Sequence, residues 1–542
     1  MDLEAEKNSD ALKMAWATIQ QRLRTIRLGG GKTRMKKLHD QGKWSARERI
    51  NYLVDNSKDC FEIGALAASD MYAEYGGCPA AAVVVVIAKI SGHRCVIVAN
   101  DATVKAGAWF PMTAKKNLRA QEIAMENNIP IVYLVDSAGI FLPLQDQIFA
   151  DKEDFGRIFR NNAKMSSMGI VQIAAVMGNC VAGGAYLPVM SDETIIVEKT
   201  GSIFLAGSYL VKAAIGESVE NELLGGATTH SAISGVTDYK AKNDEDALNR
   251  IKRLFEKMGQ PTPTGFQRNT PRSPVLSTEA LFKVLPYKRT QPYDSYTLLE
   301  GLIDKDSMDE YKKEYGQTLI TTYARIEGWS VGIIANQRKV VKTQKGEMQF
   351  GGVIYGDAAD KATRFIANCN QRKIPLVFLQ DVTGFMVGSK AEHGGIIKDG
   401  AKMVNAVANS IVPKFTIVIG NSFGAGNYAM CGKAYDPRLM LAWPSAQMAV
   451  MGGEQAANVL LQIEKATAAK KGEKITSQTE NELLKKIQAR YLAQTDVVYG
   501  AARLWTDAVI DPAQTRAWIS MGIDMANHAP LQQPFNMGVL QV

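Results

Sequence analysis

The chain contains 542 residues, 46% of them hydrophobic and 22% charged, and its formal net charge at pH 7 is +8. This length exceeds one ordinary hydrophobic core and predicts two domains of a soluble globular protein. No apolar run approaches the roughly 20 residues that cross a bilayer, and the first ten residues lack the pattern of a secretory or transit peptide. We therefore expect a cytoplasmic protein without a membrane partner.

The segment from Gln21 to Arg49 is strongly basic. It holds ten Lys or Arg residues and two acidic ones, an excess as large as that of the whole chain. Such a segment can attract nucleic acid or phosphorylated ligands, or it can be a solvated or subunit-facing helical segment. Because no nucleic-acid-binding motif accompanies it, we expect no nucleic-acid partner. Its Gly29-Gly-Gly-Lys-Thr33 stretch is not a phosphate loop, since Ile26 replaces the first glycine of that motif.

Strands and helices alternate along the next part of the chain. The apolar run Pro79–Ala88 is typical of a buried strand, and Ala114–Asn127 is typical of a helix. Ile129-Pro-Ile-Val-Tyr-Leu-Val-Asp-Ser-Ala-Gly139 predicts a buried strand that ends in a tight loop. Val171–Met177 predicts another strand, which leads into Gly178-Asn-Cys-Val-Ala-Gly-Gly-Ala-Tyr186.

The same order of elements is repeated in the second half of the chain. Asp357–Asn370 is a matching helical segment, and Ile374-Pro-Leu-Val-Phe-Leu-Gln-Asp-Val-Thr-Gly384 repeats the strand and tight loop. The strand Phe415–Ile419 then leads into Gly420-Asn-Ser-Phe-Gly-Ala-Gly-Asn-Tyr428, a second glycine loop. Two motifs repeated in the same order indicate an internal duplication.

A polar, proline-rich stretch separates the two copies. It begins at Pro261-Thr-Pro-Thr-Gly265 and continues to Pro274, which is typical of a domain junction. Together with the alternation of strands and helices, it predicts an α/β protein with two similarly built domains. We place the domains at residues 1–260 and 276–542 and the linker at 261–275.

The two glycine loops are the strongest candidates for chemistry. Glycine lets the backbone approach a ligand closely, and the N–H groups at a helix start can bind an oxyanion. One such loop is more often a tight turn, but two on duplicated domains suggest two oxyanion sites for two carbonyl compounds. Asp136 and Asp381, which end the preceding strands, could cap these loops or transfer protons. No serine nucleophile elbow supports a catalytic triad, and neither the histidines nor the six scattered cysteines have metal-ligand spacing.

With these motifs the chain resembles the carboxyltransferase (β) subunits of biotin-dependent acyl-CoA carboxylases, most closely those of methylcrotonoyl-CoA carboxylase. The resemblance extends over nearly the whole chain. Its segments are Gly29–Gly31, Ala46–Ile50, Phe155–Phe159, Val181–Tyr186, Ile203–Gly207, Val211–Ala214, Gly225–Ala227, Thr383–Gly388, Lys398–Val404, Tyr428–Gly432, Val450–Ala457 and Asp507–Pro512.

The resemblance implies two crotonase-like domains, and a hexamer whose active sites lie between the N-terminal domain of one protomer and the C-terminal domain of another. It implies that backbone N–H groups of Gly183 and Gly184 hold a thioester enolate, and that those of Ala425 and Gly426 hold the ureido oxygen of biotin. Further substrate-binding positions would be Gly139, Ala182, Ala185, Tyr186, Phe385, Gly424, Asn427 and Tyr428.

The implied reaction moves carbon dioxide from carboxybiotin to a coenzyme A thioester without a metal in this chain. The freed biotin nitrogen would take the acidic proton of the substrate. Ala11-Leu-Lys-Met14 resembles a biotin attachment sequence, but it lies in a helical segment without a surrounding β-rich domain. We therefore expect the biotin on a partner, an α subunit with biotin carboxylase and biotin carrier domains.

The sequence does not decide which acyl group the substrate carries. Methylcrotonoyl enzymes have an aromatic residue where this chain has Arg160 and a Pro-Pro pair where it has Ser208-Tyr209, and Met348–Asp360 also differs. A propionyl, geranyl or other acyl group is therefore an alternative, and Arg160 could bind a second carboxylate or pair across a subunit interface. Two other functions are a decarboxylase subunit of the glutaconyl-CoA type, which runs the transfer in reverse with a membrane sodium pump, and a non-catalytic scaffold.

Overall fold

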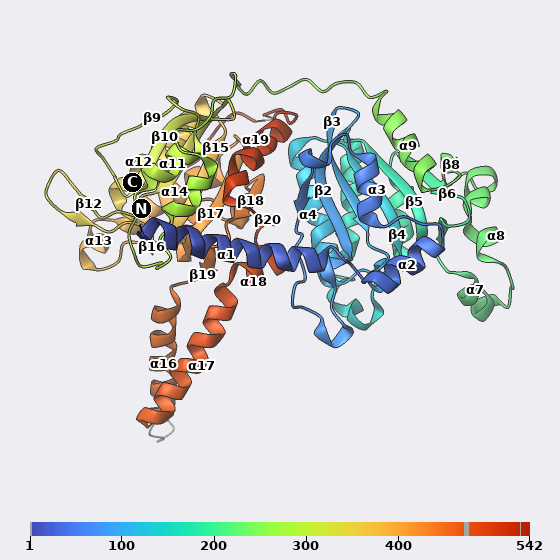
Figure 1. Ribbon diagram of the computed structural model, residues 1–542, viewed down its shortest axis with the longest axis horizontal. Coiled ribbons are helices and arrows are strands. Elements are labelled where there is room, and N and C mark those ends of the chain that lie inside the picture. The colour runs from blue at the N-terminus through green and yellow to red at the C-terminus, as the bar shows by residue number, and fades with distance from the viewer. Residues whose placement is uncertain (1–2, 471–475, 532, 542) are drawn as a thin grey trace. The chain divides into compact units, whose positions relative to one another are not determined.

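The computed structural model describes residues 3–470, 476–531 and 533–541 (Figure 1). The chain forms two compact units. Unit 2 comprises Gln21–Pro263 and Ala502–Leu504, and unit 1 comprises Met1–Gln20, Thr264–Ala501 and Trp505–Val542. Within the described ranges, no helix is both long enough and apolar enough to span a membrane.

Unit 2 is built on one eight-stranded sheet with the order β1-β2-β3-β4-β5-β6-β8, in which β7 also pairs with β5. The first three strands are antiparallel, and from β3 onward neighbours are parallel. The strands are β1 (Phe61–Ile63), β2 (Val83–Ile90), β3 (His93–Asn100), β4 (Ile131–Ser137), β5 (Gln172–Val181), β6 (Glu193–Val197), β7 (Ser202–Phe204) and β8 (Tyr239–Ala241). The helices in this part of the chain are α2 (Lys32–Asp40), α3 (Ala46–Leu53), α4 (Pro111–Asn127), α5 (Phe155–Ser167), α6 (Tyr186–Val189), α7 (Ser208–Ile215), α8 (Asn221–Gly225) and α9 (Asp244–Phe255).

Unit 1 repeats this sheet with the order β20-β18-β17-β15-β11-β10-β9, in which β19 also pairs with β17. Again the first three strands in the chain are antiparallel and the others parallel. The strands are β9 (Asp309–Glu310), β10 (Leu319–Ile326), β11 (Trp329–Asn336), β15 (Leu376–Val382), β17 (Lys414–Phe423), β18 (Leu439–Ala442), β19 (Gln447–Ala449) and β20 (Ala508–Val509). Two small sheets pair β12 (Val341–Lys342) with β13 (Met348–Gln349) and β14 (Val353–Ile354) with β16 (Gly384–Phe385).

The other helices follow the duplication only in part. Helices α12 and α14 lie between β11 and β15 and between β15 and β17 in the chain, as α4 and α5 lie between β3 and β4 and between β4 and β5. Helices α16 and α17 form a long helical hairpin (Figure 1). The remaining bounds are α1 (Leu3–Ile26), α10 (Leu281–Val284), α11 (Ser295–Leu302), α12 (Gly356–Gln371), α13 (Ser389–His393), α14 (Ile396–Ala408), α15 (Gly424–Ala429), α16 (Gly453–Lys470), α17 (Ser477–Thr495), α18 (Val497–Ala502) and α19 (Thr515–Ala526). The predicted α/β class and the duplicated order of elements are confirmed.

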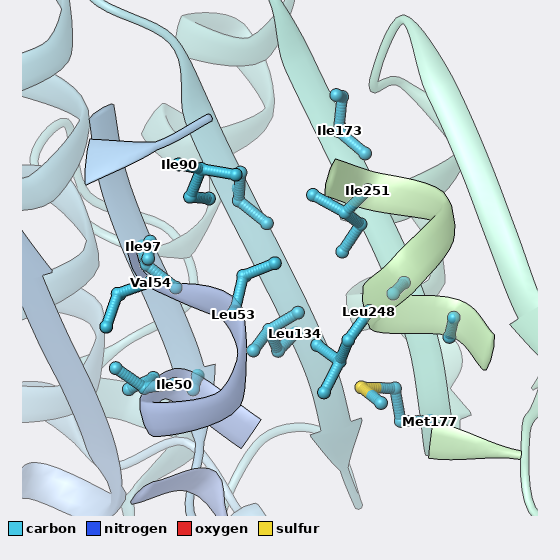
Figure 2. Close-up of a cluster of buried hydrophobic side chains, with 14 of the residues drawn as sticks. Ile50, Leu53, Val54, Ile90, Ile97, Leu134, Ile173, Met177, Leu248 and Ile251 are labelled. Carbon is cyan, nitrogen blue, oxygen red and sulfur yellow. The ribbon is translucent and has the colours of Figure 1, made fainter. Parts of the chain in front are cut away.

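The core of unit 2 lies where α3 and α9 pack on the sheet. Leu53 of α3 and Leu248 of α9 face Ile97, Leu134 and Ile173 of the central strands, and all five side chains are buried (Figure 2). Helix α3 begins at a capping box, in which the Ser45 side chain accepts a hydrogen bond from the backbone N–H of Glu48. Alternation of strand side chains between the two faces leaves every second residue for this core.

The run Pro79–Ala88 is not one strand, so that prediction was wrong at its start. Ala80, Ala81 and Ala82 have φ values of 51°, 56° and 54°, and β2 begins only at Val83. Left-handed backbone costs about 1–2 kcal/mol per non-glycine residue. The buried Lys116 amino group of α4 offsets part of this cost by donating to the carbonyls of Ala80 (3.0 Å) and Val83 (2.7 Å).

Candidate active site

The first glycine loop follows β5. After Val181, residues Ala182–Ala185 form a 3-10 turn that continues into α6. Gly183 and Gly184 are the second and third residues of this turn, and the N–H of Gly183 has no acceptor within the turn itself. The turn begins with a left-handed residue, since the φ of Ala182 is 57°.

The second glycine loop has the same design in unit 1. Helix α15 follows β17 directly and begins at Gly424, whose φ is 54°. Ala425 and Gly426 are its second and third residues, so their N–H groups also lack an acceptor within the helix. The four residues predicted for catalysis therefore form two pairs at equivalent positions, one pair in each unit.

Aromatic side chains of α5 support the first loop. A Cβ atom added at Gly183 would lie 3.1 Å from the Phe155 ring, and the Phe159 ring lies 5.9 Å from that of Tyr186. The Cys180 thiol donates to the carbonyl of Gly184 at 3.3 Å. Burial, with a smaller effect of a nearby carboxylate, raises the pKa of the Cys180 thiol to about 12, so it is a neutral donor. The segment Phe155–Phe159, which the sequence singled out only for its family resemblance, thus packs against this loop.

A polar network supports the second loop. Ser422 Oγ donates to Gln380 Oε1 at 2.6 Å, and Gln380 Nε2 donates to the carbonyl of Met430 at 2.6 Å. Asn427 Nδ2 closes the network by donating to Ser422 Oγ at 2.7 Å. The loop is also packed tightly, because a Cβ atom added at Gly426 would lie 2.6 Å from the Val382 side chain.

The other predicted substrate-binding residues lie in or beside these loops. Tyr186 and Tyr428 are equivalent in the repeat and equally exposed, each at 49%. Gly139 has a φ of 87° in the loop after β4, and its N–H donates to Ser137 Oγ. Ala185 is buried. Phe385 belongs to β16, and its ring would lie 3.0 Å from a Cβ atom added at Gly400.

A cavity of about 1010 Å³ lies in unit 1. Its lining includes Met348, Phe350 and Tyr355, together with Met386 and Val387, which follow Phe385 in the chain. The segment Met348–Asp360, which differs from methylcrotonoyl enzymes in sequence, thus contributes apolar side chains to a cavity that the two residues after β16 also line.

Residues marked for substrate choice in unit 2 are on the surface. Arg160 is an exposed residue of α5 whose guanidinium donates to the side chain of Asn161 at 3.4 Å. Tyr209 is exposed on α7, a helix without a buried residue. Among the described residues, no three His, Cys, Asp or Glu side chains are placed to hold a metal ion.

The basic segment is partly internal, which the sequence did not reveal. Lys43 Nζ lies 2.9 Å from Asp136, Arg47 pairs with Glu62 at 2.8 Å, and Arg49 is buried. These acids are distant in the sequence, so no local pattern could have paired them with their cations. The two strand-end aspartates are buried as well, at 3% exposure for Asp136 and 7% for Asp381, which favours a structural role over proton transfer.

Comparison with known proteins shows the family of the chain. The carboxyl transferase domain family matches residues 37–537. The chain is 46% identical over 517 residues to the biotin-dependent 3-methylcrotonyl-coenzyme A carboxylase beta1 subunit of Mycobacterium tuberculosis, covering 95% of each protein. It is 46% identical over 519 residues to the methylcrotonoyl-CoA carboxylase beta chain of Dictyostelium discoideum, covering 95% of this chain and 85% of the relative. The crystal structure of the P. aeruginosa geranyl-CoA carboxylase beta subunit superimposes with a TM-score of 0.86 at 33% identity, over 99% of this chain and 97% of the other. The chain therefore belongs to the carboxyl transferase domain family, that of the carboxyltransferase subunits of biotin-dependent acyl-CoA carboxylases.

Proposed function

We propose that the chain transfers carbon dioxide from carboxybiotin, carried by a partner subunit, to the acyl group of a coenzyme A thioester. The observation that carries this proposal is the pair of glycine loops, which start a helical segment at equivalent positions of a duplicated fold. Two oxyanion sites suit a reaction in which two carbonyl compounds both gain negative charge.

Each loop has one task in this proposal. The N–H groups of Gly183 and Gly184 donate to the thioester oxygen as the substrate loses its acidic proton. Those of Ala425 and Gly426 donate to the ureido oxygen of biotin. Carboxybiotin supplies the carbon dioxide and, once freed of it, the nitrogen that takes the proton. Oxyanion donors of this kind contribute about 3–4 kcal/mol each to the transition state.

Methylcrotonoyl-CoA is the first substrate to test, because the two relatives at 46% identity bear that name. A geranyl group is the next, because the geranyl-CoA carboxylase subunit shares the fold at 33% identity. The side chains that would decide between them include Arg160 of α5 and the apolar residues Met348 and Phe350 of the cavity.

We further propose a cytoplasmic complex with an α subunit that bears biotin carboxylase and biotin carrier domains, and a hexamer of the present chain. The resemblance to β subunits supports both. Light scattering of the isolated chain measures its assembly, and an active monomer would contradict the hexamer. Covalent biotin on this polypeptide, detected with streptavidin, would contradict the division of labour between subunits.

The deciding experiment is an assay of the complex with ATP, bicarbonate and a panel of methylcrotonoyl-, propionyl- and geranyl-CoA. We expect ATP-dependent carboxylation, with kcat/KM highest for methylcrotonoyl-CoA. Decarboxylation that depends on sodium and a membrane partner would support the reverse-acting alternative instead. Absence of both activities in a well-folded complex would leave the scaffold as the remaining function.

A further inference from the structure

Both sheets contain the same irregularity next to the glycine loops. Between β4 and β5, Val135 pairs with Val176 but Ser137 pairs with Cys180, so Asp136 alone faces three residues of β5. In unit 1 the register of β15 and β17 shifts in the same way around Asp381. Each strand-end aspartate is therefore placed where its neighbouring strand bulges.

These bulges change the pairing partner of the loop-bearing strand. The β5 residues up to Val176 pair with β6, whereas those from Asn179 onward pair with β7. Likewise, β17 pairs with β18 up to Val418 and with β19 from Asn421 onward. A bulge bends its strand and changes the direction of the residues beyond it. The direction of each glycine loop, which begins a few residues later, is therefore determined at the bulge.

The aspartate side chain fills each bulge. A Cβ atom added at Gly178 would lie 1.9 Å from the Asp136 carboxylate, and one added at Gly420 would lie 2.5 Å from that of Asp381. Only glycine leaves room for the carboxylate at either place. In unit 1 the carboxylate also accepts the backbone N–H of Asn421 at 2.8 Å, directly on the loop-bearing strand.

Matching asparagines hold the backbone of the two aspartates. The N–H of Asp136 donates to Asn100 Oδ1 at 3.3 Å, and the N–H of Asp381 donates to Asn336 Oδ1 at 3.1 Å. Asn100 and Asn336 are both the last residues of the third strand of their unit. The asparagine, the aspartate and the glycine are thus the same in both copies.

The groups that compensate the two buried charges differ in part. Lys43 Nζ donates to both Asp136 oxygens at 3.1 and 2.9 Å, and the buried Arg49 guanidinium lies 3.5 Å from one of them. Asp381 accepts from the Tyr293 hydroxyl at 3.0 Å and lies 3.3 Å from Arg338 Nε. A buried carboxylate needs such partners to offset its desolvation. Each copy meets that need with an arginine and one further side chain, Lys43 or Tyr293, and both keep the contact between aspartate and bulge.

We propose that Asp136 and Asp381 are positioning residues for the two oxyanion sites. Each carboxylate stabilises the geometry of one bulge. The bulge determines the direction of the glycine loop that follows it, and therefore which ligand the N–H groups of that loop contact. Neither carboxylate takes part in proton transfer. This inference rests on the proposed function, and it assigns Asp136 to the thioester site and Asp381 to the biotin site.

The test compares Asp136→Asn, Asp381→Asn and Asp304→Asn in the full complex. Asp304 is the matched control, because it is also buried, at 1% exposure, and paired with Arg516 at 2.9 Å, yet it touches neither loop-bearing strand. Two rates are measured, namely complete carboxylation and the decay of carboxylated free biotin without acyl-CoA. The KM for acyl-CoA is determined as well, because misaimed donors lower kcat without weakening the bound substrate.

Misplacement of a reacting group by about 1 Å can cost about 100-fold in rate. We therefore expect Asp381→Asn to slow both rates by about 10-fold or more, and Asp136→Asn to slow only complete carboxylation, with KM within about two-fold of wild type. Asp304→Asn should change neither rate by more than about two-fold. The inference is overturned if both aspartate variants keep both rates, as Asp304→Asn should. It is also overturned if Asp136→Asn slows the decay of carboxylated biotin as much as Asp381→Asn does.

Tyr293→Phe keeps the test decisive if Asp381→Asn does not fold. It deletes only the hydroxyl that donates to Asp381, so we expect a loss of a few-fold in both rates, and unchanged rates would overturn the assignment of Asp381. A wild-type complex that carboxylates no acyl-CoA contradicts the proposed function rather than this inference.

Discussion

The two glycine loops share a backbone path but differ in the side chains that hold them. In both, a left-handed residue opens a short helix, and this residue is Ala182 in the first loop and Gly424 in the second. A thiol and aromatic rings support the first loop, whereas hydroxyl and amide groups of Ser422, Gln380 and Asn427 support the second. The comparison teaches that the duplicated feature is the main-chain geometry, while the supporting side chains have diverged.

This difference has a physical consequence for the two sites. A thiol is a weak hydrogen-bond donor, whereas a fully satisfied polar network rigidifies the segment that it holds. We therefore expect the second loop, assigned to the invariant ligand biotin, to be more rigid than the first loop, assigned to the variable acyl thioester. Variants in both loops test this contrast.

The largest effect is expected from proline in either loop. Proline removes the N–H group, and it is tolerated in the first turn of a helix. Ala425→Pro and Gly184→Pro should each lower kcat by about 10²–10³-fold. Decay of carboxylated free biotin should fall only in Ala425→Pro. Circular dichroism and acyl-CoA binding serve as folding controls, and equal loss of biotin decay in both variants would refute one ligand per loop.

Removal of the supporting hydrogen-bond donors should affect the second loop more. Ser422→Ala leaves Gln380 Oε1 and Asn427 Nδ2 without the hydroxyl that joins them, at a cost of about 1–3 kcal/mol. Cys180→Ala removes a weaker donor and should cost about 1 kcal/mol or less. Hydrogen exchange of the loop amides, followed by mass spectrometry, should rise more in Ser422→Ala. A larger rise in Cys180→Ala would reverse the assigned order of rigidity.

Equivalent buried lysines allow the two halves to be compared by pH. Burial lowers the pKa of Lys116 to about 7 and that of Lys361 to about 8, from 10.5. The folded chain loses each proton at the lower pH, whereas the unfolded chain keeps it to about 10.5. Stability should therefore rise with pH above 7 through Lys116 and above 8 through Lys361, by at most about 1.4 kcal/mol per pH unit each.

Methionine at either position should remove its share of this rise. Urea midpoints measured from pH 6.5 to pH 9.5 should show Lys116→Met diverging from wild type already between about pH 7 and 8, and Lys361→Met only above about pH 8. Parallel curves for wild type and both variants would mean that these ammonium groups stay charged in the fold.

The smallest effect concerns the residue that opens each loop. Ala182→Gly should stabilise the chain by about 1 kcal/mol, because glycine adopts a left-handed φ without strain. Gly424→Ala should destabilise it by about 1–2 kcal/mol, since it adds strain and places a Cβ atom 2.9 Å from the carbonyl of Val450. Thermal melting measures both, and shifts of the same sign would contradict the equivalence of the two positions.

Local patterns predicted the elements of the fold but not their irregularities. The repeat of strand, Asp-x-x-Gly and glycine loop was visible because each motif is contiguous, and the helices predicted from Ala114 and Asp357 lie within α4 and α12. The strands predicted to end at Met177 and Ile419 continue to Val181 and Phe423. Glycine indicated a loop there, whereas the bulge lets the strand go on with a new partner.

For the candidate site, too, the sequence indicated some residues and not others. The glycine motifs marked the two loops, and the resemblance to the carboxyltransferase family named Gly183, Gly184, Ala425 and Gly426 within them. The partners Lys43 of Asp136 and Arg338 of Asp381 could not be named, because burial and long-range pairing decide them. The role of the four loop residues remains a prediction that the proline variants address.

The left-handed turn at Ala80–Ala82 bears on the order in which unit 2 folds. Helix α4 satisfies two of its carbonyls, since the Thr113 hydroxyl donates to Ala81 and the Lys116 amino group to Ala80, whereas the carbonyl of Ala82 accepts the backbone N–H of Asp101. Alone, the turn is strained and its alanines favour other conformations. We therefore expect the turn before β2 to become ordered only when α4 packs against it. Slow folding phases of the chain should accordingly respond to substitutions in α4 rather than in the turn.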